Sequence, residues 1–325
     1  MAFKNFGKRT LLAGDLQLNR GVDVLRDPIV GTSWFVDGVN GADTNSGKTW
    51  GAAFLTMSKA FTSLSSGDRV FLKGRVREQL DTPAQIFDVG IYGVSHNTRH
   101  PDATPAGGET VPARWDAPAS PTASTPLLNI RQQGWYVSNV LFTGDSANTV
   151  DCIQLYRDSG SGNSERDASH TTIANCRFQG GRYGVVDNGG VARARILDNE
   201  FMLFSSSGDR AITQTGTAIG TKWGWIIDGN DFHANLTDIQ IALAGPRITN
   251  NHFHLNSLGV TNTAAIILYV AAGFTGGTEE LVARNFMYCD SAEASVVNAR
   301  FTATATGIWG PNYYSDKEEY GEPAE

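Results

Sequence analysis

A pair of carboxylates, Glu200 and Asp231, occupies the same position in successive copies of a short motif in the second half of the chain. Arg177 and His252 hold that position in the copies before and after them. If the copies stack as neighbouring strands, the two carboxylates lie about 5 Å apart. Carboxylates this close push their pKa values apart, which leaves one of them able to act as an acid. Because a separation of about 5–5.5 Å suits retaining glycoside hydrolysis, we predict Glu200 and Asp231 as catalytic residues.

The residues around this pair are candidates for binding a sugar. His233 and His254 follow the motif aromatic in two copies, and the nearby Trp223 and Trp225 could supply a stacking platform. The predicted substrate-binding residues are therefore Trp223, Trp225, Arg177, His252, His233 and His254. A structural interpretation stays open, because an Arg–Glu–Asp–His ladder is also ordinary surface pairing. The tryptophans can likewise belong to the core or to a subunit contact.

The sequence predicts neither a metal nor a cofactor. His233 and His254 have side chains that bind metals, but no carboxylate completes a clear site with them. Asp187, Asp209 and Asp228 are further carboxylates on neighbouring turns. No GxGxxG motif follows a strand, and the chain contains no Walker A, GxSxG or HExxH motif.

The motif that sets this register joins an aliphatic residue to an aromatic one through a turn that contains asparagine. Its copies are VSNVLF at 137–142, IANCRF at 173–178, ILDNEF at 196–201, IDGNDF at 227–232, ITNNHF at 248–253 and VARNFM at 282–287. The spacings fit coils of roughly two dozen residues, some with loop insertions. Stacked copies would fill a narrow dry core, and asparagine amides would bond between coils. A β-sandwich or propeller with accidental recurrences is the alternative. Suitable strands between the copies lie at 184–187, 238–242 and 264–268.

Residues 33–74 predict a strand at 34–36, Asp-Gly and Asn-Gly turns, an amphipathic helix near 50–64 and a strand at 69–72. This segment resembles the start of pectate-lyase-like β-helix proteins, on the residues Val36-Asp37-Gly38, Asn40-Gly41-Ala42-Asp43, Trp50, Phe54, Met57, Ala60-Phe61 and Gly67-Asp68-Arg69-Val70. The resemblance implies a helix that caps the open N-terminal end of the stack. Further strands are predicted at 86–93 and 127–130, with a long surface loop over 97–126.

Composition narrows the class of protein. The chain has 325 residues, a net charge of −7 and no basic stripe, so nucleic acid is not an expected partner. No apolar run approaches the roughly 18 residues of a membrane span. The first 20 residues lack the apolar segment of a signal peptide, so we expect folding in a cytoplasm. The three cysteines have no zinc-ligand spacing and are predicted to be small buried residues: Cys152, Cys176 and Cys289.

The predicted fold is all-β: a right-handed single-stranded parallel β-helix over 33–310, with an N-terminal arm at 1–32 and an acidic tail at 311–325. This organisation resembles bacteriophage virion-surface proteins such as tailspikes. The resemblance implies a homotrimer on a virion assembled in the host cytoplasm, attached to other virion proteins through residues 1–32. It also implies recognition of a host surface glycan and, if the protein is an enzyme, glycoside hydrolysis. The alternatives are a capsid decoration protein without enzymatic activity and a cellular polysaccharide lyase or hydrolase.

Overall fold

The structure, a computed structural model, describes residues 31–94, 113–158, 166–214, 224–241, 245–255, 264–268, 281–289, 301–303 and 308–314. Most regular structure in these residues is β-strand, in three sheets whose neighbouring strands all run parallel. Within the same ranges, no helix is long and apolar enough to cross a membrane.

The strands of each sheet follow one another along the stack. Sheet A contains β1 (Ser33–Asp37), β2 (Arg69–Lys73), β5 (Gly90–Gly93), β8 (Tyr136–Ser138), β11 (Thr172–Ala174), β14 (Arg195–Leu197), β17 (Ile226–Asp228), β20 (Arg247–Thr249), β23 (Leu281–Ala283) and β26 (Ile308–Trp309). Sheet B contains β3 (Arg75–Arg77), β6 (Arg114–Asp116), β9 (Leu141–Thr143), β12 (Arg177–Gln179), β15 (Glu200–Met202), β18 (Asp231–His233), β21 (His252–Leu255), β24 (Phe286–Cys289) and β27 (Tyr313–Tyr314). Sheet C contains β4 (Leu80–Asp81), β7 (Leu128–Ile130), β10 (Asp151–Tyr156), β13 (Tyr183–Asn188), β16 (Arg210–Gln214), β19 (Thr237–Ile241), β22 (Ala264–Leu268) and β25 (Phe301–Ala303).

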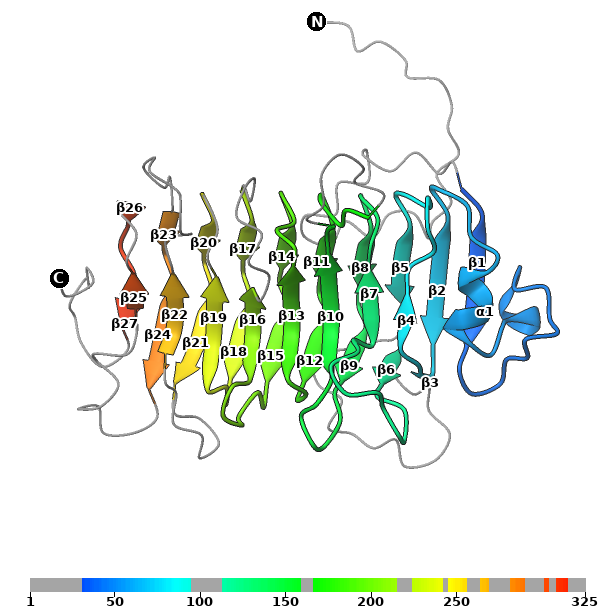
Figure 1. Cartoon of the computed structure of the whole chain (residues 1–325), viewed down its shortest axis with the longest axis horizontal. Helices are drawn as coiled ribbons and strands as arrows, with labels where there is room; N and C mark the ends of the chain where they lie inside the picture. The colour runs from blue at the N-terminus through cyan, green and yellow to red at the C-terminus, as the bar shows by residue number, and fades with distance from the viewer. Residues whose placement is uncertain are drawn as a thin grey trace, which may run out of the picture. The chain divides into compact units, whose positions relative to one another are not determined.

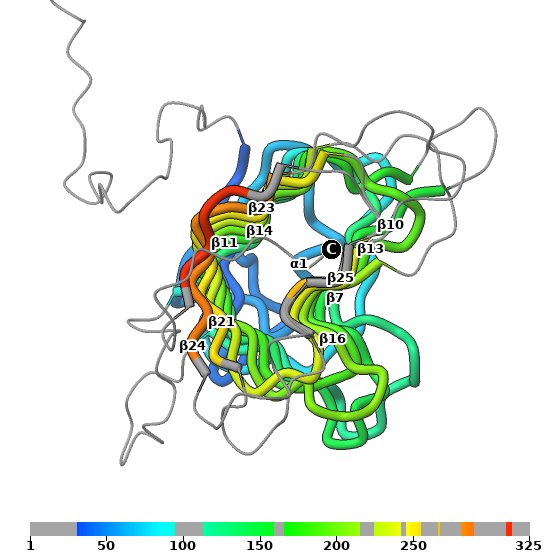
Figure 2. The backbone as a smooth tube through the Cα atoms, turned by 90° about the vertical axis from the view of Figure 1, so that its left-hand side faces the viewer, coloured from blue at the N-terminus to red at the C-terminus, as the bar shows by residue number. Residues whose placement is uncertain are grey.

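Each coil adds one strand to sheet A, one to sheet B and one to sheet C, as β14, β15 and β16 do before β17 starts the next coil. Figure 1 shows the strands of successive coils side by side. In Figure 2, where the C-terminal end faces the viewer, the chain turns anticlockwise from sheet A through sheet B to sheet C as it approaches. That sense is right-handed, so the predicted right-handed parallel β-helix is confirmed.

The motif builds the core as the sequence predicts. Equivalent residues pair in register, so Ile196 lies beside Ile227 and Phe201 beside Phe232. The aromatic position forms a buried column with ring centroids 4.7–5.3 Å apart and planes within 9° of parallel: Phe142, Phe178, Phe201, Phe232 and Phe253. Offset aromatic stacking adds to the free energy of burial in such a column.

The turn conformation and the hydrogen bonds between coils, both expected of one asparagine position, belong to two neighbouring positions of the motif. The left-handed turn conformation falls on the residue two before the strand of sheet B, which is Asn139 or Asn175 in the first copies. The next position carries a buried ladder in which each side-chain amide donates to the carbonyl oxygen of the following side chain at 2.9–3.0 Å: Asn199, Asn230, Asn251, Asn285 and Asn312. The first two copies therefore have the same turn as the others, and what they lack is the ladder residue.

The N-terminal helix is shorter than predicted. The segment near 50–64 forms a 3₁₀ turn, η1 (Trp50–Ala52), and a short helix, α1 (Met57–Phe61). Between them Phe54 makes a parallel bridge to Val36, and its N–H and carbonyl bond the backbone of β1 at 2.9 Å. Pairing with a strand excludes helical geometry at this residue, which splits the predicted helix. Phe61 still packs against Trp135 near the start of the stack, with ring centroids 5.8 Å apart.

Two boundaries differ from the prediction. The segment 97–126, predicted as a loop, contains β6, and Trp115 on that strand stacks on Phe142 at 5.8 Å. At the other end β27 pairs with β24, so the stack continues past residue 310 into the predicted tail. Cys152 and Cys176 are buried, as predicted, and the side chain of Cys289 lies outside the described residues. Burial raises the pKa of Cys176 to about 12, which leaves it unreactive at neutral pH.

Candidate functional site

The candidate site lies on the outer face of sheet B. The motif aromatic of each strand points into the core, so the residues on either side of it point outward. The register places Arg177 beside Glu200, Glu200 beside Asp231, and Asp231 beside His252, as predicted. The residues two places further along form a second outward column: Gln179, Met202, His233, His254 and Tyr288.

Exposure rises along the first column toward the C-terminal end. Leu141 and Arg177 are only 1% and 4% exposed, Glu200 and Asp231 are half-buried, and His252 is exposed. The first members of the column are therefore closed to solvent. A ligand can reach the column only from Glu200 onward.

Arg177 positions Glu200. Its Nε lies 3.4 Å from Glu200 Oε2, and the two side chains are 5% and 16% exposed. Its Nη2 also contacts Met202 Sδ at 2.7 Å. Salt screens a covered ion pair less than it screens an exposed one. Arg177 is therefore a positioning residue for Glu200, and its predicted contact with substrate is wrong.

Asp231, His233 and His254, which we call the Asp–His triad, converge on one point. Oδ1 of Asp231 lies 3.1 Å from Nε2 of His233 and 3.2 Å from Nε2 of His254. The two imidazoles stack with centroids 4.0 Å apart and planes 21° from parallel. Asp231 and His233 are alternate residues of β18, and His254 is the register partner of His233 on β21. Two rigid strands therefore fix all three side chains.

The triad sets the protonation of its own members. Burial raises the pKa of Asp231, but the imidazoles of His233 and His254 lower it by more, so it lies well below the ordinary value. Burial lowers the pKa of His233, but Asp231 and then Glu200 raise it by more, so the net direction is upward. The two imidazoles, and not a second carboxylate, are the groups that lower the pKa of Asp231. An ionised Asp231 could serve as the nucleophile of retaining glycoside hydrolysis but not as its acid.

The same three side chains can hold a metal ion. Their ligand atoms all lie within 4.8 Å of one another, and this is the one such group among the described residues. The inference that no carboxylate joins His233 and His254 is therefore wrong. Asp231 supplies it from the residue two before His233, on the same face of the same strand.

Exposed aromatic rings continue the site toward the C-terminal end. Phe286, Tyr288 and Tyr313 are 39%, 43% and 42% exposed and lie on the neighbouring strands β24 and β27. The ring of His252 lies 5.8 Å from that of Phe286, and the ring of His254 lies 6.0 Å from that of Tyr288. The triad and these rings, which we call the aromatic strip, form one continuous surface.

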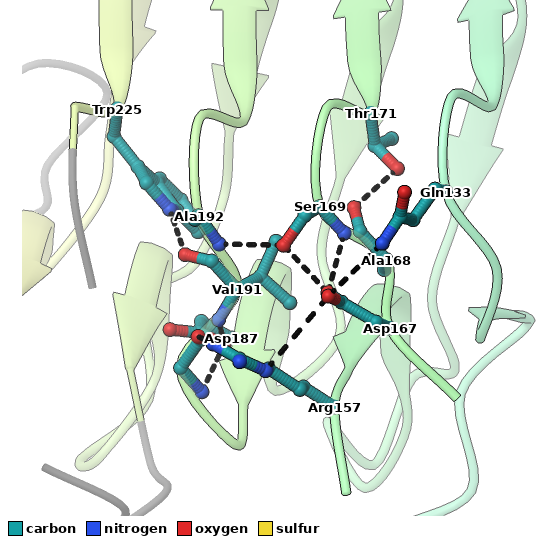
Figure 3. Close-up of polar contacts among 11 residues, drawn as sticks. Gln133, Arg157, Asp167, Ala168, Ser169, Thr171, Asp187, Val191, Ala192 and Trp225 are labelled. Carbon is teal, nitrogen blue, oxygen red and sulfur yellow. Dashed lines mark hydrogen bonds and ion pairs between the residues drawn. The ribbon is translucent and has the colours of Figure 1, made fainter. Parts of the chain in front are cut away.

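The tryptophans are not part of this surface. Trp225 is fully buried, and its indole Nε1 donates to the carbonyl oxygen of Val191 at 2.8 Å (Figure 3). Its predicted role as a sugar platform is wrong, and its alternative role in the core is confirmed. Trp223 lies outside the described residues.

The remaining predicted carboxylates stabilise turns away from sheet B. Asp187 accepts hydrogen bonds at 3.0 Å from the backbone N–H groups of Gly190 and Val191. Asp209 accepts from the N–H of Ser206 at 2.9 Å, and Asp228 accepts from the amide of Asn250 at 2.6 Å. These carboxylates satisfy groups of the protein itself, so they do not add to the candidate site.

A further acid, Asp167, does the same at the corner between sheets C and A (Figure 3). Its Oδ1 accepts from the backbone N–H and the hydroxyl of Ser169, at 2.9 and 2.5 Å. The hydroxyl in turn accepts from the N–H of Ala192 on the next coil at 3.0 Å. Asp167, Ser169 and Asp187 form what we call the turn network.

The three parallel sheets define the chain as a parallel β-helix protein. Among solved structures, that of XylC in complex with xylose matches 87% of this chain and 70% of its own, with a TM-score of 0.54 and 12% identity. Pectate lyase Pel9A matches 89% and 78% of the two chains, with a TM-score of 0.48 and 13% identity. Dettilon tailspike protein matches 86% and 68%, with a TM-score of 0.33 and 11% identity. At this identity the likeness to XylC shows a shared fold. The sequence matches no protein-family model and no curated protein.

Proposed function

We propose that the outer face of sheet B binds a linear glycan, with the aromatic strip as the stacking platform. The observation that carries this proposal is the continuity of Phe286, Tyr288 and Tyr313 with the triad on neighbouring coils. Aromatic rings present a flat apolar face to a sugar, and the triad side chains supply hydrogen-bonding groups beside it. Equivalent positions recur about every 4.8 Å along the stack, which suits a polymer with a repeating unit.

The finer parts of the proposal rest on the sequence. We place the protein on a phage virion as a homotrimer that recognises host surface polysaccharide, with residues 1–32 as the attachment arm. Residues 1–30 lie outside the described residues. Light scattering on the purified chain tests the trimer, and a monomer at micromolar concentration would contradict it.

Binding to fragments of bacterial capsular polysaccharide and lipopolysaccharide tests the glycan site. Replacing Phe286 with Ala should weaken binding roughly two- to tenfold, because one exposed stacking contact contributes about 0.5–1.5 kcal/mol. The matched control is Phe87→Ala, since Phe87 is equally exposed, at 40%, and lies outside sheet B. Equal losses in the two variants would contradict the proposal.

Hydrolysis is a separate part of the same test. Mass analysis of each polysaccharide after incubation with the wild type and with Glu200→Gln reveals any shortening. Loss of cleavage in that variant, with binding retained, would support the catalytic role predicted for Glu200. If the wild type binds the polysaccharide without shortening it, the protein binds the glycan but does not hydrolyse it.

A further inference from the structure

We propose that the Asp–His triad binds one divalent transition-metal ion of the Zn²⁺ class. Two imidazole nitrogens and one carboxylate oxygen form the donor set, which suits Zn²⁺ and its first-row neighbours and is poorly suited to Ca²⁺ or Mg²⁺. The proposal is independent of glycan binding, since it concerns only the three side chains and the ion.

The spacing of the donor atoms fits a single ion. Two donors bound at about 2.0–2.1 Å to one tetrahedral ion lie about 3.3 Å apart. Oδ1 of Asp231 lies 3.1 and 3.2 Å from the two Nε2 atoms, and one ligand atom from each of the three side chains lies within 4.8 Å of the others. The two oxygen–nitrogen distances therefore already match those around a single ion.

The arrangement is poorer as a set of hydrogen bonds. No described residue donates a hydrogen bond of acceptable geometry to Oδ1 of Asp231, although this atom is buried and the two Nε2 atoms are close. A buried carboxylate oxygen without an aligned donor costs free energy, which a coordinated cation would offset. Two imidazole nitrogens and one carboxylate oxygen that converge without aligned hydrogen bonds have the arrangement of metal ligands.

The surroundings admit an ion from solvent. The side chains of Asp231, His233 and His254 are 43%, 25% and 33% exposed, so the site is open on one side. Three protein ligands leave at least one coordination position for water or for a ligand oxygen. Glu200, on the neighbouring strand, adds negative charge close to the site.

Titration of the chelator-treated protein with ZnCl₂ tests the proposal by calorimetry. We expect one Zn²⁺ per chain in the wild type, with affinity reduced at least tenfold in His233→Ala, His254→Ala and Asp231→Asn. The matched control is His252→Ala, because His252 is a histidine on the same strand and face as His254 but outside the triad. That variant should bind like the wild type.

Two further measurements guard against variants that misfold. Co²⁺ should give the wild type and His252→Ala a visible d–d absorption band that the triad variants lack. Zn²⁺ should raise the Tm of the first two proteins and leave that of the triad variants unchanged. Absence of Zn²⁺ binding by the wild type would overturn the proposal. Equal loss of binding in His252→Ala and His254→Ala would also overturn it.

Discussion

The turn network and the Asp–His triad both surround an aspartate with groups that can donate hydrogen bonds, but these groups differ in kind. In the turn network, the Oδ1 atoms of Asp167 and Asp187 accept from backbone N–H groups, and that of Asp167 also accepts from the Ser169 hydroxyl. In the triad, the ionic partners of Asp231 among the described residues are two imidazoles, which can bind metals or exchange protons.

Burial separates the two regions in the same way. The side chain of Asp167 is 10% exposed and Asp187 is buried, whereas the side chain of Asp231 is 43% exposed. A carboxylate that receives N–H groups from its own turn holds the backbone in place, and a ligand has no access to it. A carboxylate that receives imidazoles on an open face is available for chemistry. The kind of partner therefore separates the two regions more clearly than the presence of an acid does.

The largest expected loss of stability comes from a substitution that disrupts the turn network. Asp167→Ala removes the acceptor of two Ser169 donors, so it should lower the free energy of unfolding by about 2–4 kcal/mol. Asp231→Ala should cost less than about 1 kcal/mol, because its side chain is partly exposed and has no aligned hydrogen bond. Urea unfolding of both variants measures the difference. Equal losses would show that the triad is structural as well.

A smaller effect concerns Asp238, a carboxylate of sheet C that neither region contains. Burial raises its pKa well above the ordinary value, although a hydrogen bond from the amide of Asn235 lowers it in part. A raised folded-state pKa means that folding takes up a proton. The resulting stabilisation is full below the unfolded pKa near 4 and is lost as the pH rises through the folded pKa.

Asp238→Asn should remove this pH dependence. Each unit of pKa difference corresponds to about 1.4 kcal/mol, so the variant should gain stability relative to the wild type as the pH rises from about 4 to 7. Unfolding midpoints at several pH values, compared with those of Asp231→Asn, test it. In Asp231→Asn the trend should have the opposite sign and lie at lower pH, because the folded pKa of Asp231 is lowered: the wild type should lose stability relative to the variant as the pH falls below about 4 and should change little relative to it above about pH 5. Parallel pH profiles for the two variants would contradict both assignments.

The sequence predicts the fold well because each copy of the motif carries the same kind of apolar residue at the positions that stack on one another. Ile196 and Phe201 recur at fixed separation, and neighbours of identical type can fill a narrow core in only one register. The details that fail depend on contacts distant in sequence. The apolar residues around Phe54 have helical spacing, but its backbone pairs with strand β1. Trp115 looks isolated in a loop rich in Pro and Gly, yet it begins the aromatic column.

The candidate site was only partly predictable, for a related reason. Register places Asp231 beside the histidines, and the alternation Asp-Phe-His followed by His-Phe-His puts all the flanking residues on one face. That alternation was the signal for the triad. The convergence of atoms on Asp231 Oδ1 depends on rotamers, which the pattern does not specify. The role of Tyr313 depends on a seventh motif copy, in which Trp309 and tyrosine replace the usual aliphatic residue and phenylalanine.

The smallest expected change in stability is the one caused by substitutions in the aromatic strip. Replacing Phe286 and Tyr288 together with Ser should lower the free energy of unfolding by about 1 kcal/mol or less, since both residues are exposed, at 39% and 43%. The register partner of Phe286, His252, is exposed too, so it does not depend on the ring for its burial. Urea unfolding checks this value. A loss above about 2 kcal/mol would mean that the aromatic strip is part of the fold, and its exposure would then need a structural explanation in place of a ligand.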